Sequence, residues 1–290
     1  MTTDPQLLSN PRSDRVKQVA ALGRRAVRAR TGRFLVEGPQ AVRELLAYAV
    51  HAAVEVYLTP AAGERHPEIT ALLDRGQASY ATGDTLRTRP GTRSAPGPRL
   101  WWCTEEVLAA MADTGSPQGM LAVADRVDVP LGEALAAVGE GEFAVVLTHV
   151  RDPGNAGTVL RGADAFGAAA VLVSDASVDV YNPKVVRSTV GSLFHLPVSV
   201  GTPVTELLNA CRERGIRLLA ADGTGTTMLP DVDLTGPHAW VMGNEAWGLE
   251  PEVLELCDEV VAIPIQRAES LNLAMAATVC LHASASARTR

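Results

Sequence analysis

The chain has 290 residues, 47% of them hydrophobic and 4% aromatic, with a formal net charge of −7. This length allows one large domain or two ordinary ones, and the apolar content suffices for a sizeable core, which excludes general disorder. No apolar run approaches the ~20 residues that a membrane helix needs, and the polar first ten residues lack a secretory pattern.

The first predicted element is a basic helix over residues 12–30. Between residues 12 and 33, eight basic side chains stand against one acidic residue, so this stretch is strongly positive in an acidic chain. Because RNA is a polyanion, we expect it to meet this part first. Charge alone supports a solvated helix without a partner about equally well. The candidate RNA-binding residues are Arg12, Arg15, Arg24, Arg25, Arg28 and Arg33.

The rest of the first 125 residues is predicted to form a small α/β module. A short apolar run at 34–37 is followed by helical spacing at 41–50, and strands are predicted at 54–58 and 118–124. Thr104 is expected to cap a helix. An exposed loop is expected over 84–98. A second basic stretch holds Arg87, Arg89, Arg93 and Arg99.

From Glu142 onward, continuous apolar runs alternate with helical patterns. This alternation predicts an α/β fold with a parallel sheet covered by helices on both faces. We therefore expect a catalytic domain over 142–290, joined by a linker over 126–141 to an N-terminal domain over 1–125. The predicted strands are 143–150, 169–173, 196–200, 216–220, 239–242 and 259–263. The predicted helices are 156–166, 183–190, 203–214 and 271–285.

Three loops rich in glycine and polar residues each follow a predicted strand, at 152–157, 242–248 and 263–272. In open parallel sheets, ligands bind beyond the carboxyl ends of the strands. Each loop alone could be a structural turn, since turns use Gly, Pro and Asn for backbone reasons. Three such loops at one edge of one sheet favour a binding site.

Other ligand motifs are missing from the sequence. The chain has no G-x-G-x-x-G after its first buried strand, no P-loop, no G-x-S-x-G elbow and no H-E-x-x-H pair. An oxidoreductase with a dinucleotide cofactor is therefore remote. The four cysteines are far apart and make no metal motif, so we expect a reduced, cytoplasmic protein without a structural metal.

The three loops resemble the motifs of the SpoU (TrmH-type) RNA 2′-O-ribose methyltransferases, in the order of that family. The matching segments are Asp152–Gly167, Asn182–Pro197, Val241–Leu249 and Ser270–Ala276. Residues 34–43 resemble the start of the family's N-terminal substrate-binding domain. The resemblance implies a deep trefoil knot, S-adenosylmethionine held in the knotted loops, and a homodimer with each active site near the subunit interface.

The resemblance also implies roles for individual residues. Arg161 is expected to activate the ribose hydroxyl, by electrostatic stabilisation because a guanidinium stays protonated. Asn155 would orient Arg161 or simply cap its helix, and Glu245 would bond Asn155 or Arg161. Ser270 and Asn272 complete the expected catalytic set. The expected cofactor-binding residues are Gly243, Gly248, Ile263 and Leu271.

The last helix is expected to contribute to the homodimer through a small apolar face, and ordinary core packing explains that face equally well. The residues of the face are Leu273, Ala276, Ala277 and Leu281. The loop before Ser270 lacks the glycine of many family members, so we expect a different loop shape there. Its arginine–glutamate form resembles SpoU enzymes that confer resistance to ribosome-targeting antibiotics.

The predicted function is 2′-O-ribose methylation of RNA. A separate N-terminal domain favours ribosomal RNA over tRNA, and 23S rRNA in particular. A tRNA ribose methyltransferase is one alternative. A non-catalytic RNA-binding or ribosome-assembly protein on the same fold is another, although the intact motif residues count against it.

Overall fold

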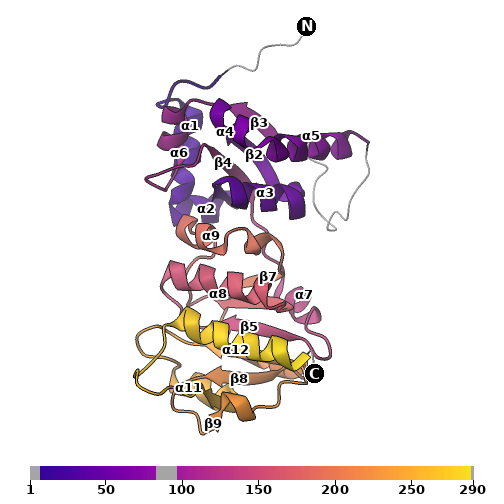
Figure 1. The fold of residues 1–290 in the computed structure, drawn as a ribbon, viewed down its shortest axis with the longest axis vertical. Coiled ribbons are helices and arrows are strands. Elements are labelled where there is room, and N and C mark those ends of the chain that lie inside the picture. Colours follow the sequence, from indigo (N-terminus) through magenta and orange to yellow (C-terminus); the bar gives the residue numbers. More distant parts are fainter. Residues whose placement is uncertain (1–6, 83–96, 289–290) are drawn as a thin grey trace. The chain divides into compact units, whose positions relative to one another are not determined.

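The computed structural model describes residues 7–82 and 97–288, which cluster into two compact units (Figure 1). Unit 1 comprises Met1–Val127 and Tyr181–Phe194, and unit 2 comprises Asp128–Val180 and His195–Arg290. The range 142–290, predicted to be one catalytic domain, is therefore interrupted by a segment that packs with unit 1. Of the second basic stretch, only Arg99 lies among the described residues.

Unit 1 is built on a four-stranded sheet in the order β1-β4-β2-β3. β1 and β2 run antiparallel to β4, whereas β3 runs parallel to β2. The predicted strands at 54–58 and 118–124 correspond to β2 and β4, but β3, which is short and only half-buried, was not predicted. The strands are β1 Arg33–Glu37, β2 Ala53–Leu58, β3 Arg99–Trp102 and β4 Met120–Asp125.

The first helix predicted in unit 1 is divided in the structure. The single basic helix predicted over 12–30 is wrong, because a 3-10 turn at Ala21–Gly23 divides it into α1 and α2. Ser13 caps α1 by accepting from the Val16 amide. Thr104 caps α6 in the predicted way, through Val107 N. The helices are α1 Asp14–Ala20, α2 Arg25–Thr31, α3 Pro39–Tyr48, α4 Pro60–Arg65, α5 Pro67–Thr82, α6 Glu105–Met111 and α9 Pro183–Thr189.

The α9 segment, residues 181–194, is held in unit 1 by aromatic packing on β1. The ring of Phe34 lies 4.6 Å from that of Tyr181 and 6.4 Å from that of Phe194. All three rings are buried, so the contact removes a large apolar area from water. The Tyr181 hydroxyl also accepts from the amide of Val127.

Unit 2 is a seven-stranded sheet in the order β7-β6-β5-β10-β8-β11-β9, and every pair of neighbours is parallel. The predicted strands are all present, and only the two-residue edge strand β9 was missed. The strands are β5 Phe143–Leu147, β6 Ala170–Ser174, β7 Val198–Thr202, β8 Arg217–Ala221, β9 Thr227–Met228, β10 His238–Met242 and β11 Glu259–Ala262.

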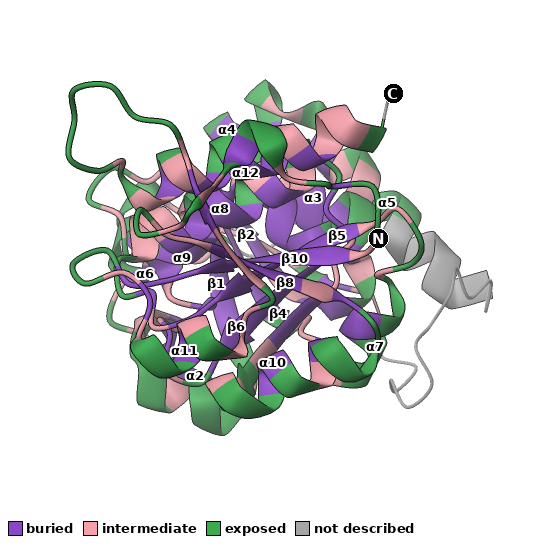
Figure 2. Cartoon of the chain, turned by 90° about the horizontal axis from the view of Figure 1, so that it is seen from below, coloured by how far each residue is buried: buried purple, intermediate pink, exposed green. Residues whose placement is uncertain are grey.

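Helices cover both faces of this sheet. α7, α10 and α11 pack on one face through Leu135, Leu208 and Val253, while α8 and α12 pack on each other and on the opposite face. Figure 2 shows the strands in the buried colour and α10 with an exposed outer surface. The helices are α7 Leu131–Ala136, α8 Pro153–Ala165, α10 Val204–Glu213, α11 Pro251–Leu256 and α12 Leu273–Arg288.

Two features of unit 2 bear on the predictions. Residues 126–141, predicted to be a linker, contain α7, whose Ala134 and Leu135 are buried in the core. In the described part of the chain, no helix is long and apolar enough to cross a membrane. The observed architecture is the predicted α/β fold with a parallel sheet.

Candidate functional site

The three predicted motif loops lie at the carboxyl ends of β5, β10 and β11. β5 and β10 are neighbours in the sheet, so the loops that follow them meet directly. Thr148 joins them, since both its amide and its hydroxyl donate to the Met242 carbonyl, at 2.9 and 3.0 Å. His149 then turns the chain with a φ of +56°, which few non-glycine residues adopt.

Glu245 connects the second motif loop to the start of α8. Its carboxylate accepts from the amides of Arg151 and Asp152, at 3.1 and 3.0 Å. The same carboxylate accepts from Asn155 Nδ2 at 3.3 Å. Of the two partners that the sequence suggested for Glu245, the structure therefore pairs it with Asn155, and no bond to Arg161 is present among the described residues.

Asn155 connects all three loops. While its Nδ2 donates to Glu245, its Oδ1 accepts from Asn272 Nδ2 at 3.1 Å. The helix cap suggested for Asn155 is wrong, because α8 is capped by Asp152, whose Oδ1 accepts from the Asn155 amide at 2.8 Å. Asn272 in turn accepts from Ala274 N and so begins α12. One polar chain thus joins the three motifs.

Two expected catalytic residues lie outside this chain of bonds. Arg161 is exposed on α8, and among the described residues it has no hydrogen bond or ion pair. Ser270 is exposed in the segment before α12, which begins at Leu273, two residues later than predicted. Both side chains are therefore accessible to a ligand that arrives from solvent.

The glycines of the second loop let the backbone fold closely on itself. A Cβ on Gly243 would lie 2.4 Å from the Gly248 carbonyl oxygen, so no other residue fits there. Gly248 has a φ of +73°, and its amide donates to the Asn244 carbonyl. Ile263 and Leu271, the apolar positions expected around adenine, are both half-buried at the ends of the third loop.

A fourth loop at the same edge was missed by sequence reasoning. It follows β8, and its Asp222 carboxylate would lie 3.0 Å from a Cβ on Gly248. Gly225 in this loop lies so close to β11 that a Cβ would come within 2.6 Å of the Val260 carbonyl oxygen. The two glycines at 223 and 225 could have indicated this loop, but they match no known ligand-binding motif.

The candidate RNA-binding arginines differ in how far they are exposed to solvent. Arg28 does not fit that role, because it is buried and donates to the carbonyls of Leu22 and Gly23. Arg15 is half-buried, paired with Glu55 and stacked over Trp101 at 4.1 Å. The exposed candidates are Arg12, Arg24, Arg25 and Arg33, the last of which pairs with Asp125 at 3.0 Å.

The face of α12 proposed for dimerisation is partly wrong. Ala277 and Leu281 are fully buried in the protein's own core, where Leu281 packs against Gly162 of α8. The large apolar side chains that α12 exposes are Met275 and Val279, at 58% and 38%. Core packing therefore explains the small apolar stripe, and the exposed surface lies on another side of the helix.

Two family models and a relative of similar length match the chain. The SpoU rRNA Methylase family matches residues 142–282, and the MRM3-like substrate binding domain matches residues 13–122. A 23S rRNA (uridine(2479)-2′-O)-methyltransferase of Streptomyces viridochromogenes is 34% identical over 271 residues, which are 91% of this chain and 86% of the relative. The chain belongs to the SpoU rRNA methylase family.

Solved structures of SpoU-type enzymes have the same fold. An AdoMet-bound rRNA methyltransferase from Sinorhizobium meliloti superposes with a TM-score of 0.79 at 25% identity, covering 96% of this chain and 97% of that one. The SpoU methyltransferase AviRb from Streptomyces viridochromogenes, in complex with AdoMet, gives 0.75 at 30% identity, covering 96% and 99%. The resemblance inferred from the motifs is thus confirmed, and an oxidoreductase is excluded.

Proposed function

We propose that this SpoU family member transfers a methyl group from S-adenosylmethionine to a ribose 2′-hydroxyl of ribosomal RNA, most specifically of 23S rRNA. The observation that carries the proposal is the polar chain from Glu245 through Asn155 to Asn272, which joins the three motif loops at one sheet edge. The relatives named as 23S rRNA 2′-O-methyltransferases support the choice of substrate.

The reaction needs two substrates held in line and a poorly acidic proton removed. Arg161 is suited to stabilise the developing alkoxide, because a guanidinium stays protonated and this one is exposed and unpaired among the described residues. Asn155 and Glu245 act as positioning residues that hold the start of α8, and with it the helix that carries Arg161. Ser270 adds an accessible hydroxyl at the third loop.

The residues at this edge fit S-adenosylmethionine. The sulfonium of the bound cofactor supplies the methyl group. Half-buried Ile263 and Leu271 provide apolar walls, and the bare backbone at Gly243 and Gly248 provides amide and carbonyl groups without side chains. The two similar structures described as AdoMet-bound support this assignment.

Further features follow from family membership and belong to the proposal. We expect the C-terminal part of the chain to form a deep trefoil knot and two chains to associate as a homodimer. Unit 1 acts as the RNA substrate-binding domain, in keeping with its family match, and the exposed arginines of α1 and α2 contribute charge. An rRNA substrate implies action in the cytoplasm. Protection of the ribosome against an antibiotic stays a prediction.

The test is methyl transfer from tritiated S-adenosylmethionine to unmodified 23S rRNA, 16S rRNA and tRNA. A 2′-O-methyl group removes the hydroxyl that attacks the adjacent phosphodiester, so the product is one dinucleotide that resists alkali. Arg161→Ala is expected to lose about a hundredfold or more in rate, the magnitude typical of one oxyanion-stabilising group. Label in 23S rRNA alone would establish the target.

Arg214→Ala is the matched control, since it removes an equally exposed arginine at the end of α10. It should retain full activity. Absence of label in every RNA, from a protein that binds RNA but not the cofactor, would contradict the enzyme and favour the RNA-binding alternative. Label in tRNA alone would replace the rRNA substrate with tRNA.

A further inference from the structure

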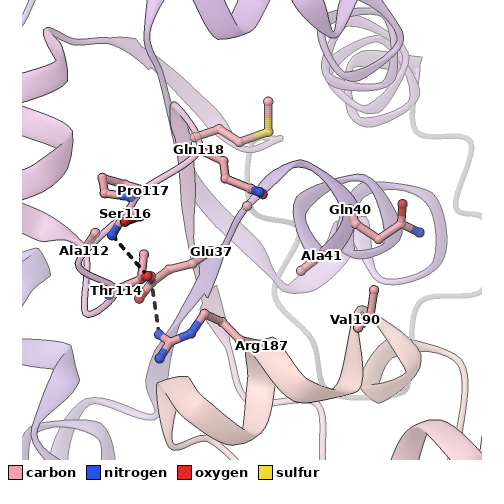
Figure 3. Close-up of a pocket in the computed structure, with 12 residues that line it drawn as sticks. Glu37, Gln40, Ala41, Ala112, Thr114, Ser116, Pro117, Gln118, Arg187 and Val190 are labelled. Atoms are coloured by element: carbon pink, nitrogen blue, oxygen red, sulfur yellow. Dashed lines mark hydrogen bonds and ion pairs between the residues drawn. The ribbon is translucent and has the colours of Figure 1, made fainter.

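Unit 1 contains a cavity of about 270 Å³ (Figure 3). It lies between the N-terminus of α3, the segment 112–118 and α9. None of the residues that line it belongs to the proposed catalytic set. It is an unassigned hollow in the unit that matches a substrate-binding domain.

A buried carboxylate, that of Glu37, lines the cavity and pairs with a half-buried arginine. The Glu37 side chain is only 4% exposed and accepts from the amides of Asp113 and Thr114, at 3.0 and 3.2 Å. Arg187 of α9 donates to the same carboxylate at 3.4 Å (Figure 3). It also donates to the Asp113 carboxylate at 3.0 Å. The Glu37 carboxylate is thus satisfied by Arg187 and two backbone amides, so it does not need a bound cation.

The walls combine apolar surface with amides and hydroxyls. Ala41, Met120 and Val190 supply apolar surface, and Gln118 carries a side-chain donor and an acceptor. Gln40 offers its side-chain oxygen as an acceptor, since its Nε2 donates to Glu44 at 2.7 Å. The first amides of α3 also lie here, and α3 has no side-chain cap because its N-cap residue is Gly38. Apolar walls with paired donors and acceptors match a nucleobase, which has flat faces and a hydrogen-bonding edge.

Backbone strain marks the same place. Val190 has a φ of +53°, which is a genuine outlier for a β-branched residue. Gly191 follows with a φ of +102°, and a Cβ there would meet Glu44 Cγ at 2.4 Å. Such strain persists only where surrounding contacts impose it, and it concentrates at ligand sites.

A second, more open hollow of about 430 Å³ adjoins the first. The two share Pro117 and Gln118, so they are neighbours along one surface. Arg65 and His66 line the second hollow, where Glu105 offsets the charge of Arg65. A nucleotide with its base in the first hollow would thus have its sugar and phosphate near Arg65.

We infer that this pair of hollows binds one unpaired nucleotide of the RNA substrate, with the base between α3 and the segment 112–118. The inference rests on the proposed RNA function and adds a specificity element to it. A base inside a duplex cannot enter such a cavity, so the site selects RNA with an unstacked residue. The alternative occupant, a free anion, would contact Arg65 but would leave the apolar walls of the first hollow uncovered.

The test uses the full chain and fluorescein-labelled hexanucleotides of uridine, adenosine or cytidine, with an RNA duplex for comparison. Gln118→Ala removes one edge partner, and Thr114→Trp fills the cavity while keeping the amide that bonds Glu37. Each should weaken binding of at least one hexanucleotide about fivefold or more and leave duplex binding unchanged. Gln18→Ala, an exposed glutamine on α1, is the matched control and should bind normally.

A 4-thiouridine hexanucleotide provides a second readout, since light-induced cross-links should map to residues 37–41 or 112–118. Equal affinity in all variants, cross-links confined to α1 and α2, or no binding of any hexanucleotide by the unmodified protein would overturn the inference. Cofactor binding and methyl transfer are measured separately. If methylation is normal and the cavity variants bind RNA as the unmodified protein does, only the nucleotide site is rejected. If RNA binding depends on the cavity but no methyl transfer occurs, only the proposed enzyme activity is rejected.

Discussion

Asn155 is the residue on which the geometry of the candidate site depends. A carboxamide carries its donor and its acceptor on two separate atoms, and Asn155 uses both. Its Nδ2 faces the Glu245 carboxylate and its Oδ1 faces Asn272 Nδ2, which fixes the orientation of the amide. An aspartate here would place two carboxylates about 3.3 Å apart and remove the donor.

We therefore predict that Asn155→Ala lowers methyl transfer about tenfold to a hundredfold, since misplaced groups cost roughly that much. Asn155→Asp should lose at least as much, because its charge repels Glu245. Both variants should keep nearly normal melting temperatures, as the site is at the surface. Asn209→Ala, an exposed asparagine on α10, is the control. Full activity in Asn155→Asp would contradict the positioning role.

The arginines of α1 and α2 show that a sequence gives the number of charges but not which of them are exposed to a ligand. Arg28 is 1% exposed and satisfies two carbonyls where the chain turns from α1 into α2. Arg25, in the same helix, is exposed. The first is a structural residue, whereas the second remains available to phosphate.

We predict opposite phenotypes for these two arginines. Arg28→Met should destabilise unit 1 by about 1–3 kcal/mol, because it leaves buried carbonyls without donors. Arg25→Ala should leave the melting temperature unchanged but weaken RNA binding and reduce the slope of log K against log salt by about one. Calorimetry and salt-dependent anisotropy measure the two effects. A stable Arg28→Met with a reduced salt slope would return Arg28 to the RNA-binding set.

At the scale of elements, a buried polar contact ties β10 to α12. His238 Nδ1 donates to the Gly236 carbonyl at 2.7 Å, which leaves Nε2 to accept from the Ser284 hydroxyl. Ser284 Oγ also accepts from Trp240 Nε1 at 2.8 Å. The side chains of His238, Trp240 and Ser284 are all buried, so this contact fixes the register of α12 on the sheet. Asn272 lies at the start of α12.

This contact predicts a dependence of stability on pH. Burial, helped by the nearby charges of Arg217 and Arg288, lowers the pKa of His238 below its usual value. The unfolded chain therefore binds a proton that the folded chain does not, starting near the unfolded pKa of about 6.5. The free energy of unfolding should fall as the pH drops below that value, by up to about 1.4 kcal/mol per pH unit, and be unaffected by this group above it.

Urea unfolding between about pH 5 and pH 8 checks this expectation. His238→Gln should be less stable than the unmodified protein at pH 8 but lose less of its stability on acidification. His282→Gln removes an exposed imidazole from α12 and should keep the normal slope. An identical slope in His238→Gln would mean that other groups carry the acid sensitivity.

At the scale of the whole molecule, the catalytic sheet was predictable because its strands are buried on both faces. Such strands appear as continuous apolar runs, as in residues 143–147, and their carboxyl ends locate the loops. The hydrogen bond between Asn155 and Asn272 was not predictable from local pattern, because the two residues are 117 positions apart in the sequence. Only the resemblance to the family motifs indicated that the two residues would lie in one site.

The packing of α9 with unit 1 was equally hidden. A helical pattern over 183–190 predicts the helix but not the surface that it covers. That choice depends on Phe34 meeting Tyr181 and Phe194, and on Arg187 meeting Glu37. Neither pairing produces a periodic pattern in the sequence, because the paired residues are roughly 150 positions apart.

The exposed side of α12 is a candidate interface for the proposed homodimer. Met275 and Val279 lie one turn apart on α12 and are both exposed, so they form an apolar strip on one side of the helix. A side chain of this size gains stability only when it is covered, and a second copy of the chain would cover it. Val279→Glu should therefore place an unpaired carboxylate in the interface and shift the protein to monomers in sedimentation.

The matched control is Met228→Glu, which changes a similarly exposed apolar side chain on the edge strand β9. It should sediment as the unmodified protein does. If each active site needs the partner chain, Val279→Glu should also lose methyl transfer in proportion to its monomer fraction, and higher protein concentrations should restore it. A fully dimeric Val279→Glu would move the interface away from this side of α12.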